Sequence, residues 1–295
     1  MNEAVKIAWF GKHFGEEPVL TGSLFFDNNV EKQSGHVKSP NGDHATGAGT
    51  IFFTGCNLRC VFCQNYQISQ QGIGKEYSIQ ELADIMIKLQ NDGAVCIDLV
   101  TPTIWWKQIK EAITIAKDNG LRLPIVWNSN GYEQLEIIKE MKGLVDIYLP
   151  DFKYSDDELA FRYSGIKKYR DIARHAIQEM FDQVGLLQEE NGIAIKGLIV
   201  RHLVLPHAIE NSFGVLDDIA NINTDVHVSL MNQYLPMHNA HEFPELSDVV
   251  SEEDFDRVHQ YMLGKDFING WVQGDKSQEC LVPDFNRNNP FLFMF

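Results

Sequence analysis

Apolar and polar residues alternate along this chain as expected for strands and helices that follow one another. Short apolar runs of strand length are separated by longer stretches with apolar residues at helical spacing. The predicted strands cover residues 50–54, 95–100, 124–127, 144–149, 195–205 and 226–231. Helical connections of ten or more residues between strands favour right-handed crossovers, and therefore a parallel sheet.

The helix with the clearest start signal begins at Ser78, where Glu81 three residues later completes a capping box. Gly93 is expected to close it. The other predicted helices cover residues 107–118, 132–141, 156–184, 211–220 and 251–262. These elements define an α/β fold, and the near-continuous apolar strands suit a partial barrel or a doubly wound sheet.

Residues with chemical potential gather after the predicted strands. In both architectures ligands bind at the carboxyl ends of the strands. The segments at these ends hold three cysteines, residues 101–103, residues 128–131, Asp151 with Lys153, and residues 232–238. Their shared position predicts a single site.

Composition limits the possible partners and location. The chain has 295 residues, 41 of them acidic and 25 basic, and a formal net charge of −16. This charge repels phosphate backbones, so no nucleic acid partner is expected. No apolar run reaches the length of a membrane span, and the N-terminus lacks the plan of a signal peptide. Three of the five cysteines crowd into one loop, which favours a reducing, cytoplasmic location over a disulfide framework.

Cys56, Cys60 and Cys63 stand in the stretch GCNLRCVFCQNY. Thiolates this close converge on a soft metal centre. A structural zinc ion or an electron-relay cluster would take a fourth ligand, for which His44 and Cys96 are candidates. A cubane cluster with three thiolates instead keeps one iron open for a ligand. A catalytic cluster and a non-catalytic metal-binding protein are therefore both considered.

The cysteine spacing, with Phe62 before the third cysteine, resembles the signature of the radical S-adenosylmethionine (SAM) superfamily. The longer string GTIFFTGCNLRCVFCQNYQIS is similar to the group related to pyruvate formate-lyase activating enzyme. Further similar blocks are LVTPT, DIYLPDFKY, RHLVLP and SLMNQYLPMH, so the resemblance spans about residues 45–265. It implies a partial (β/α)6 barrel of parallel strands.

The same resemblance implies a chemistry. A 4Fe-4S cluster on the three cysteines would bind SAM, and one electron would cleave SAM to a 5′-deoxyadenosyl radical that abstracts hydrogen. An electron donor such as flavodoxin or ferredoxin is implied. Similarity to an activating enzyme suggests a glycine of a partner protein as the target, while an unknown protein or small-molecule substrate remains open.

The resemblance also assigns roles around the cluster. Phe62 would pack near the cluster and the adenine. Gly93 stands where related enzymes carry a Gly-Gly segment near the methionine amino group, although a glycine that ends a helix has an ordinary explanation. Asn128 and Ser129 match an Asp-Thr-Asn-Gly string whose first carboxylate is replaced here by an amide.

Three charged or titratable positions complete the predicted site. Asp151 and Lys153 resemble an Asp-x-Lys pair, in which the lysine reaches the SAM carboxylate. Arg201 is expected to face the same carboxylate or to pair with an internal acid. His238 aligns with a histidine that lies close to SAM in the activating enzyme.

The organisation expected from the sequence has three parts. Residues 1–45 form an N-terminal extension with a loop rich in Asn, Ser and Gly at 27–49. Residues 46–265 form the radical SAM partial barrel, and residues 266–295 form a C-terminal tail packed on it. Cys280 lies in that tail without a partner motif.

Overall fold

The computed structural model describes residues 4–14, 17–22, 47–272 and 282–291. Six parallel strands pair within this part of the chain in the order of the sequence. They are β2 (Ala48–Phe53), β4 (Ile97–Val100), β5 (Ile125–Ser129), β6 (Ile147–Pro150), β8 (Ile193–Leu203) and β9 (His227–Met231). All six coincide with predicted strands, which confirms the α/β class and the partial barrel of parallel strands.

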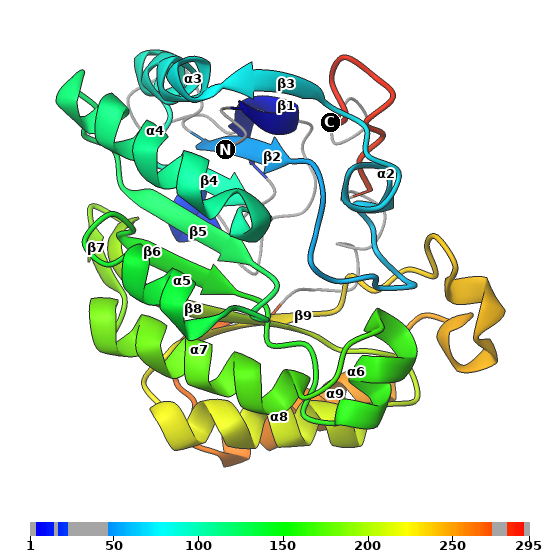
Figure 1. The fold of residues 1–295 in the computed structure, drawn as a ribbon. Coiled ribbons are helices and arrows are strands. Elements are labelled where there is room, and N and C mark those ends of the chain that lie inside the picture. The colour runs from blue at the N-terminus through cyan, green and yellow to red at the C-terminus, as the bar shows by residue number, and fades with distance from the viewer. Residues whose placement is uncertain (1–3, 15–16, 23–46, 273–281, 292–295) are drawn as a thin grey trace, which may run out of the picture.

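Helices connect the strands and lie along the outside of the curved sheet (Figure 1). They are α3 (Ile79–Asn91), α4 (Trp106–Asp118), α5 (Leu135–Glu140), α6 (Asp157–Ser164), α7 (Tyr169–Val184), α8 (Ile209–Ile222) and α9 (Glu252–Gly264). The predicted capping box is present, because Ser78 N donates to Glu81 Oε2 over 2.7 Å and Glu81 N donates to Ser78 Oγ over 3.2 Å.

The helical region predicted at 156–184 consists of two helices. Asp156 caps α6 by accepting from Glu158 N over 2.7 Å, and Gly165 ends the helix with φ of 71°. A glycine adopts this left-handed conformation without steric cost. The break places the end of α6 beside the cysteine loop.

The N-terminal segment contains a strand that the sequence pattern did not predict. Strand β1 (Ala4–His13) pairs antiparallel with β2, and β3 (Lys75–Ser78) pairs antiparallel with β1. Only Val5 and Ile7 among its first residues are fully buried, so its apolar alternation is short. The loop predicted at 27–49 lies outside the described residues from 27 to 46.

Smaller elements add to the sheet at one edge and beside β8. Strand β10 (Gly270–Val272) adds in parallel to β9, and β7 (Gln188–Glu190) pairs antiparallel with β8. The remaining turns are α1 (Pro18–Thr21), α2 (Tyr66–Ser69), η1 (Thr103–Trp105), η2 (Ala240–Glu242) and η3 (Pro244–Leu246). None of the described helices is long and apolar enough to cross a membrane.

The C-terminal segment returns to the open mouth of the sheet. The Phe291 ring lies 5.1 Å from Trp9 and 5.5 Å from Phe52, measured between centroids. Phe285 also contacts Phe52, at 5.4 Å. Residues from β1, β2 and the tail thereby close one wall of the space above the strands, whereas Cys280 lies outside the described residues.

Candidate active site

The cysteine loop follows β2 and lies at the carboxyl end of the parallel strands (Figure 1). Arg59 N donates to Ser164 O over 3.1 Å, and Val61 N donates to Tyr163 O over 2.8 Å. These two bonds flank Cys60 and fix the loop to the end of α6. The position of Cys60 is therefore set by backbone contacts on both sides.

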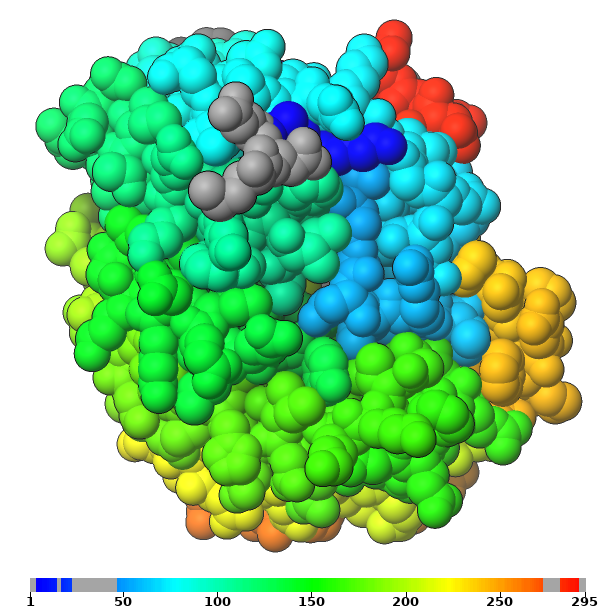
Figure 2. Space-filling model, in the orientation of Figure 1, coloured from blue at the N-terminus to red at the C-terminus, as the bar shows by residue number. Residues whose placement is uncertain are grey.

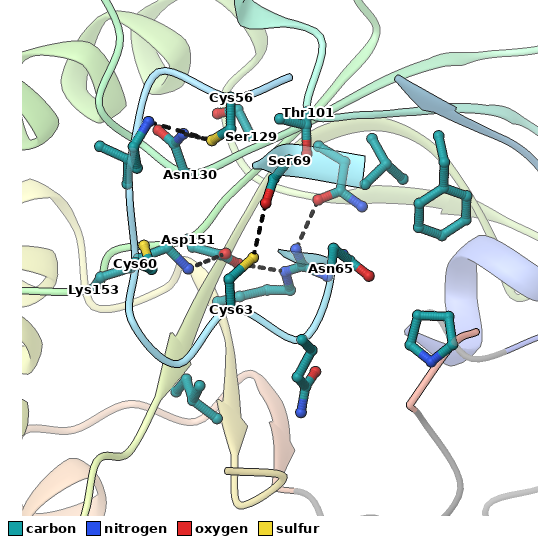
Figure 3. A pocket seen from close by; sticks show the side chains of 18 of the residues that line it. Cys56, Cys60, Cys63, Asn65, Ser69, Thr101, Ser129, Asn130, Asp151 and Lys153 are labelled. Atoms are coloured by element: carbon teal, nitrogen blue, oxygen red, sulfur yellow. Dashed lines mark hydrogen bonds and ion pairs between the residues drawn. The ribbon is translucent and has the colours of Figure 1, made fainter. Parts of the chain in front are cut away.

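Each cysteine sulfur contacts a polar partner, and Figure 3 shows the partners of Cys56 and Cys63. The Ser164 hydroxyl donates to Cys60 Sγ over 3.0 Å, and Asn130 Nδ2 donates to Cys56 Sγ over 3.3 Å. Cys63 Sγ lies 3.3 Å from Ser69 Oγ. Hydrogen bonds to a sulfur stabilise its thiolate form, which is the form that binds metal.

Burial has the opposite effect on the thiols in the absence of metal. It raises the pKa of Cys60 to about 12, against a lowering contribution from the Lys153 ammonium. Burial also raises the pKa of Cys56 and of Cys63. Metal binding therefore displaces protons from these thiols.

A charged network faces the cysteines from β6 and β8. Asp151 Oδ2 accepts from Lys153 Nζ over 2.6 Å, and Asp151 Oδ1 accepts from Arg201 Nε over 2.8 Å. Arg201 also donates to Asn128 Oδ1 over 2.7 Å. Arg201 thus pairs with an internal acid, the second of the two arrangements that the sequence left open.

The network holds one carboxylate between two cations, and each of the three side chains is 16% exposed. Burial alone would raise the pKa of Asp151, but Arg201 and Lys153 outweigh it and hold that pKa below its usual value. Burial would likewise lower the pKa of Lys153, and the Asp151 charge raises it above its usual value. All three groups are therefore ionised near neutral pH, with a net charge of +1.

One cavity joins the thiols to this network (Figure 3). Its cavity volume is about 210 Å³, below the range of about 300–1,000 Å³ for pockets that bind drug-sized ligands, and its mouth is open to solvent. Among the predicted site residues, its lining includes Cys56, Cys60, Phe62, Cys63, Asn128, Ser129, Asp151, Lys153 and Arg201.

Two predicted site residues do not line this cavity. Gly93 ends α3 with φ of 84° and precedes β4, so it lies at the opposite end of that strand from Thr101. The structure therefore places Gly93 as the end of a helix, and Thr101, with φ of 60°, is the β4 residue at the cavity. His238 stacks on Tyr66 of α2, with 4.8 Å between the ring centroids.

Several contributing residues carried no clear sequence signal. Ser69 and Ser164 contact sulfurs, but isolated serines are common in any sequence. Gly131 has φ of 76°, and a Cβ added there would overlap the carbonyl oxygen of Asp151. The Asn-Gly turn therefore lets the loops after β5 and β6 approach closely.

A buried acid lies behind the loop that follows β5. Glu133 Oε1 accepts from Thr103 Oγ1 over 2.8 Å and from Trp127 Nε1 over 3.1 Å. Burial raises the pKa of Glu133 to about 7 despite these bonds. The side chain links the ends of β4 and β5 beneath the site.

The donor set suits an iron–sulfur cluster. Three thiolates from one loop open on a shared cavity, and thiolates are the usual ligands of such clusters. The neighbouring cations provide a second, anion-binding end of the same cavity. Within the described ranges, no three His, Cys, Asp or Glu side chains are grouped around a position for one metal ion.

Comparison with known proteins identifies the family of this chain. The family model described as the radical SAM superfamily matches residues 50–214, more than half of the chain. The chain therefore belongs to the radical SAM superfamily.

The individual relatives share between 23% and 34% of their aligned residues with this chain. An uncharacterized protein of Methanocaldococcus jannaschii is 34% identical over 221 residues, covering 71% of this chain and 60% of its own length. The chain thus spans about 60% of that relative. The pyruvate formate-lyase-activating enzyme of Clostridium pasteurianum is 23% identical over 193 residues, covering 64% of this chain and 74% of that enzyme.

A solved structure shows the same fold. SuiB of Streptococcus suis, bound to SAM, aligns with a TM-score of 0.50 and 13% identity. The alignment covers 78% of this chain and 47% of SuiB. At this identity the likeness concerns the fold alone.

Proposed function

We propose that this chain is a radical SAM enzyme whose 4Fe-4S cluster is held by Cys56, Cys60 and Cys63. The observation that carries the proposal is the cavity shared by these thiols and the Asp151–Lys153–Arg201 network. One end of the cavity carries thiols that would hold a metal cluster, and the other carries cations that would bind a carboxylate. This arrangement suits SAM, whose amino-acid group would lie beside the cluster.

When bound, the cluster and SAM would together supply a 5′-deoxyadenosyl radical through one-electron cleavage of the sulfonium. The thiolates of this chain hold the cluster, and Ser164, Ser69 and Asn130 lie at hydrogen-bond distance from them. Lys153 and Arg201 offer two cations to the SAM carboxylate, which would share them with Asp151. Phe62, 6% exposed, contributes an apolar surface to the cavity.

The more specific proposal is a role like that of an activating enzyme, which acts on a partner protein. We infer it from the similarity to the Clostridium pasteurianum enzyme, together with the presence of the cysteine loop, Asp151-x-Lys153 and Arg201 in this order in the chain. The substrate would then be a glycine in a partner protein, and a small molecule is the alternative. An electron donor and a reducing compartment belong to the same proposal, because the cluster requires both.

The test is anaerobic purification, cluster reconstitution and an assay of 5′-deoxyadenosine after addition of SAM and dithionite. We expect brown protein with about four irons per chain and product formation in the wild type. Cys60→Ala should lose the iron and the product.

The matched control is Cys96→Ala, since Cys96 is buried and its thiol donates to Leu20 O, away from the cavity. That variant should keep the wild-type iron content and activity. Colourless protein with bound zinc would contradict the proposal. Full iron content without SAM cleavage would point instead to an electron-relay protein.

A further inference from the structure

A group of basic side chains lies beside the cysteine loop of this acidic protein. Arg59 belongs to the loop, Arg162 lies on α6, and Lys167 and Lys168 lie between α6 and α7. All four are exposed. We refer to these four residues as the basic patch, and Figure 2 shows the surface on which the loop and α6 meet.

The positive charge of the patch is only partly neutralised. Arg162 pairs with Glu245 at 2.5 Å. Within the described part of the chain, no carboxylate lies at ion-pair distance from Arg59, Lys167 or Lys168. These three side chains therefore present positive charge to solvent, although the formal net charge of the chain is −16.

Apolar surface adjoins the patch. Phe161 is 55% exposed, and Lys167 Nζ lies 5.4 Å from its ring centroid. Ile104, 45% exposed, lines a second cavity together with Asn57 and Tyr132. The Tyr132 hydroxyl donates to Lys167 O over 3.3 Å, so this cavity adjoins the patch at Lys167. An apolar centre with a charged rim is the usual composition of a protein-binding surface.

The patch is connected directly to a cluster ligand. Ser164 lies between Arg162 and Lys167 in the chain, and its hydroxyl donates to Cys60 Sγ. Arg59 directly precedes Cys60 in the chain, and Arg162 lies two residues before Ser164, so the patch adjoins this thiol from the loop and from α6. None of the four basic residues lines the site cavity.

The position of the patch, beside Cys60 but outside the site cavity, indicates what kind of partner it suits. A substrate has to enter the cavity to lose a hydrogen atom, and the patch gives no entry to it. An electron carrier needs only a short path to the cluster. The patch offers that path from the outer side of the loop.

We propose that the basic patch docks a negatively charged one-electron carrier protein. The inference rests on the proposed function, since it presumes a cluster at the three cysteines. The carrier gives up one electron and is oxidised by one equivalent, and the same electron reduces the bound cluster without transfer of a proton or group. Opposite charges steer such encounters, and salt weakens them.

Binding is tested first, without turnover. Oxidised bacterial flavodoxin, an acidic FMN protein, is titrated with the anaerobically purified enzyme in about 50 mM salt, where charge attraction is weakly screened. The variant K167E/K168E should bind it at least tenfold more weakly than wild type. The matched control K139E/K142E makes the same charge change at the exposed end of α5, before β6, and should bind within twofold of wild type.

Turnover separates this inference from the proposed function. With reduced flavodoxin as donor, K167E/K168E should form 5′-deoxyadenosine about tenfold more slowly than the control, while rates with dithionite should agree within twofold. Loss of the dithionite rate in the wild type would count against the proposed function, and the binding assay would still decide the docking. Equal flavodoxin binding by both variants would overturn the docking surface. The docking surface would also be overturned if K167E/K168E lost binding to a short RNA and kept its binding to flavodoxin.

Discussion

The Ser164 hydroxyl donates a hydrogen bond to the Cys60 thiol across 3.0 Å, joining residues 104 positions apart in the chain. The Tyr154 hydroxyl lies 2.7 Å from Ser164 Oγ and extends the contact to a buried chain of three groups. Because the serine proton points to the sulfur, the tyrosine supplies the proton that the serine oxygen accepts. The sulfur environment is thereby set by residues outside the cysteine motif.

Replacing Ser164 by alanine should lower the reduction potential of the reconstituted cluster. Hydrogen bonds to cluster sulfurs stabilise the reduced state, and their loss shifts the potential by tens of millivolts, as an order of magnitude. A redox titration followed by electron paramagnetic resonance measures the shift. Tyr154→Phe removes only the outer group and should give a smaller shift in the same direction. An unchanged potential in Ser164→Ala, at full iron content, would contradict the assigned contact.

Asp151→Asn should destabilise the fold in a pH-dependent way. The folded pKa of Asp151 is below its unfolded value, so its contribution is fully present above about pH 4. It is lost as the pH falls from there through the folded pKa. Breaking this buried pairing should cost about 3–5 kcal/mol at pH 7.

Denaturant unfolding of wild type and Asp151→Asn, at pH 7 and at progressively lower pH, checks this prediction. The difference in the free energy of unfolding should narrow as the pH falls below 4. A difference that stays constant across this range would show that the Asp151 charge does not stabilise the fold.

Glu133→Gln should remove a destabilisation of the folded state that grows as the pH rises and Glu133 ionises. Burial places the folded pKa of Glu133 at about 7, above the value of 4.5 for an unperturbed group. Ionisation therefore costs nothing below about pH 4.5, and its full cost, about 3 kcal/mol, is reached above pH 7. The glutamine variant should gain stability relative to wild type between pH 5 and pH 8. Parallel pH profiles of the two proteins would refute this.

Gly131→Ala and Gly143→Ala form a matched pair. Both glycines have similar left-handed backbone angles, with φ of 76° and 78°. A Cβ at Gly143 meets no atom within 4 Å, whereas one at Gly131 overlaps the Asp151 carbonyl. Gly143→Ala should cost about 1–2 kcal/mol from backbone strain alone.

Gly131→Ala should cost clearly more, because the loops after β5 and β6 have to separate. It should also weaken SAM binding, which equilibrium dialysis of the reconstituted protein would measure. Equal unfolding midpoints for the two variants would show that the close approach of the loops has little energetic weight.

The parallel part of the fold could be predicted because its strands are buried on both faces and appear as continuous apolar runs. Strand β1 could not be predicted from the sequence. Its inward alternation is limited to Val5 and Ile7, and its pairing partner β3 lies some 70 residues further along the chain. Strand β1 lies between β2 and β3, so its place in the sheet depends on tertiary pairing on both sides more than on its own pattern.

The site likewise has a part that the sequence predicts and a part that it does not. The cysteine spacing identifies its own chemistry, since few other roles need three thiols in one short loop. The partner of Arg201 could not be predicted, because Asp151 and a ligand carboxylate are equivalent choices until the register of β6 and β8 is known. Gly93, matched by resemblance to a Gly-Gly segment of related enzymes, lies at the opposite end of β4 from the cavity, and its position as the end of a helix is what its sequence context alone also predicted.

The two backbone bonds that hold Arg59 and Val61 to the end of α6 have a consequence for maturation. The binding loop is shaped by the polypeptide itself, so its ordering entropy is spent during folding and not when iron arrives. Cluster insertion then resembles the loading of a rigid receptor, unlike small metal-dependent domains that fold around their ion. A chain that has not received a cluster is therefore expected to keep its fold and to remain able to accept one.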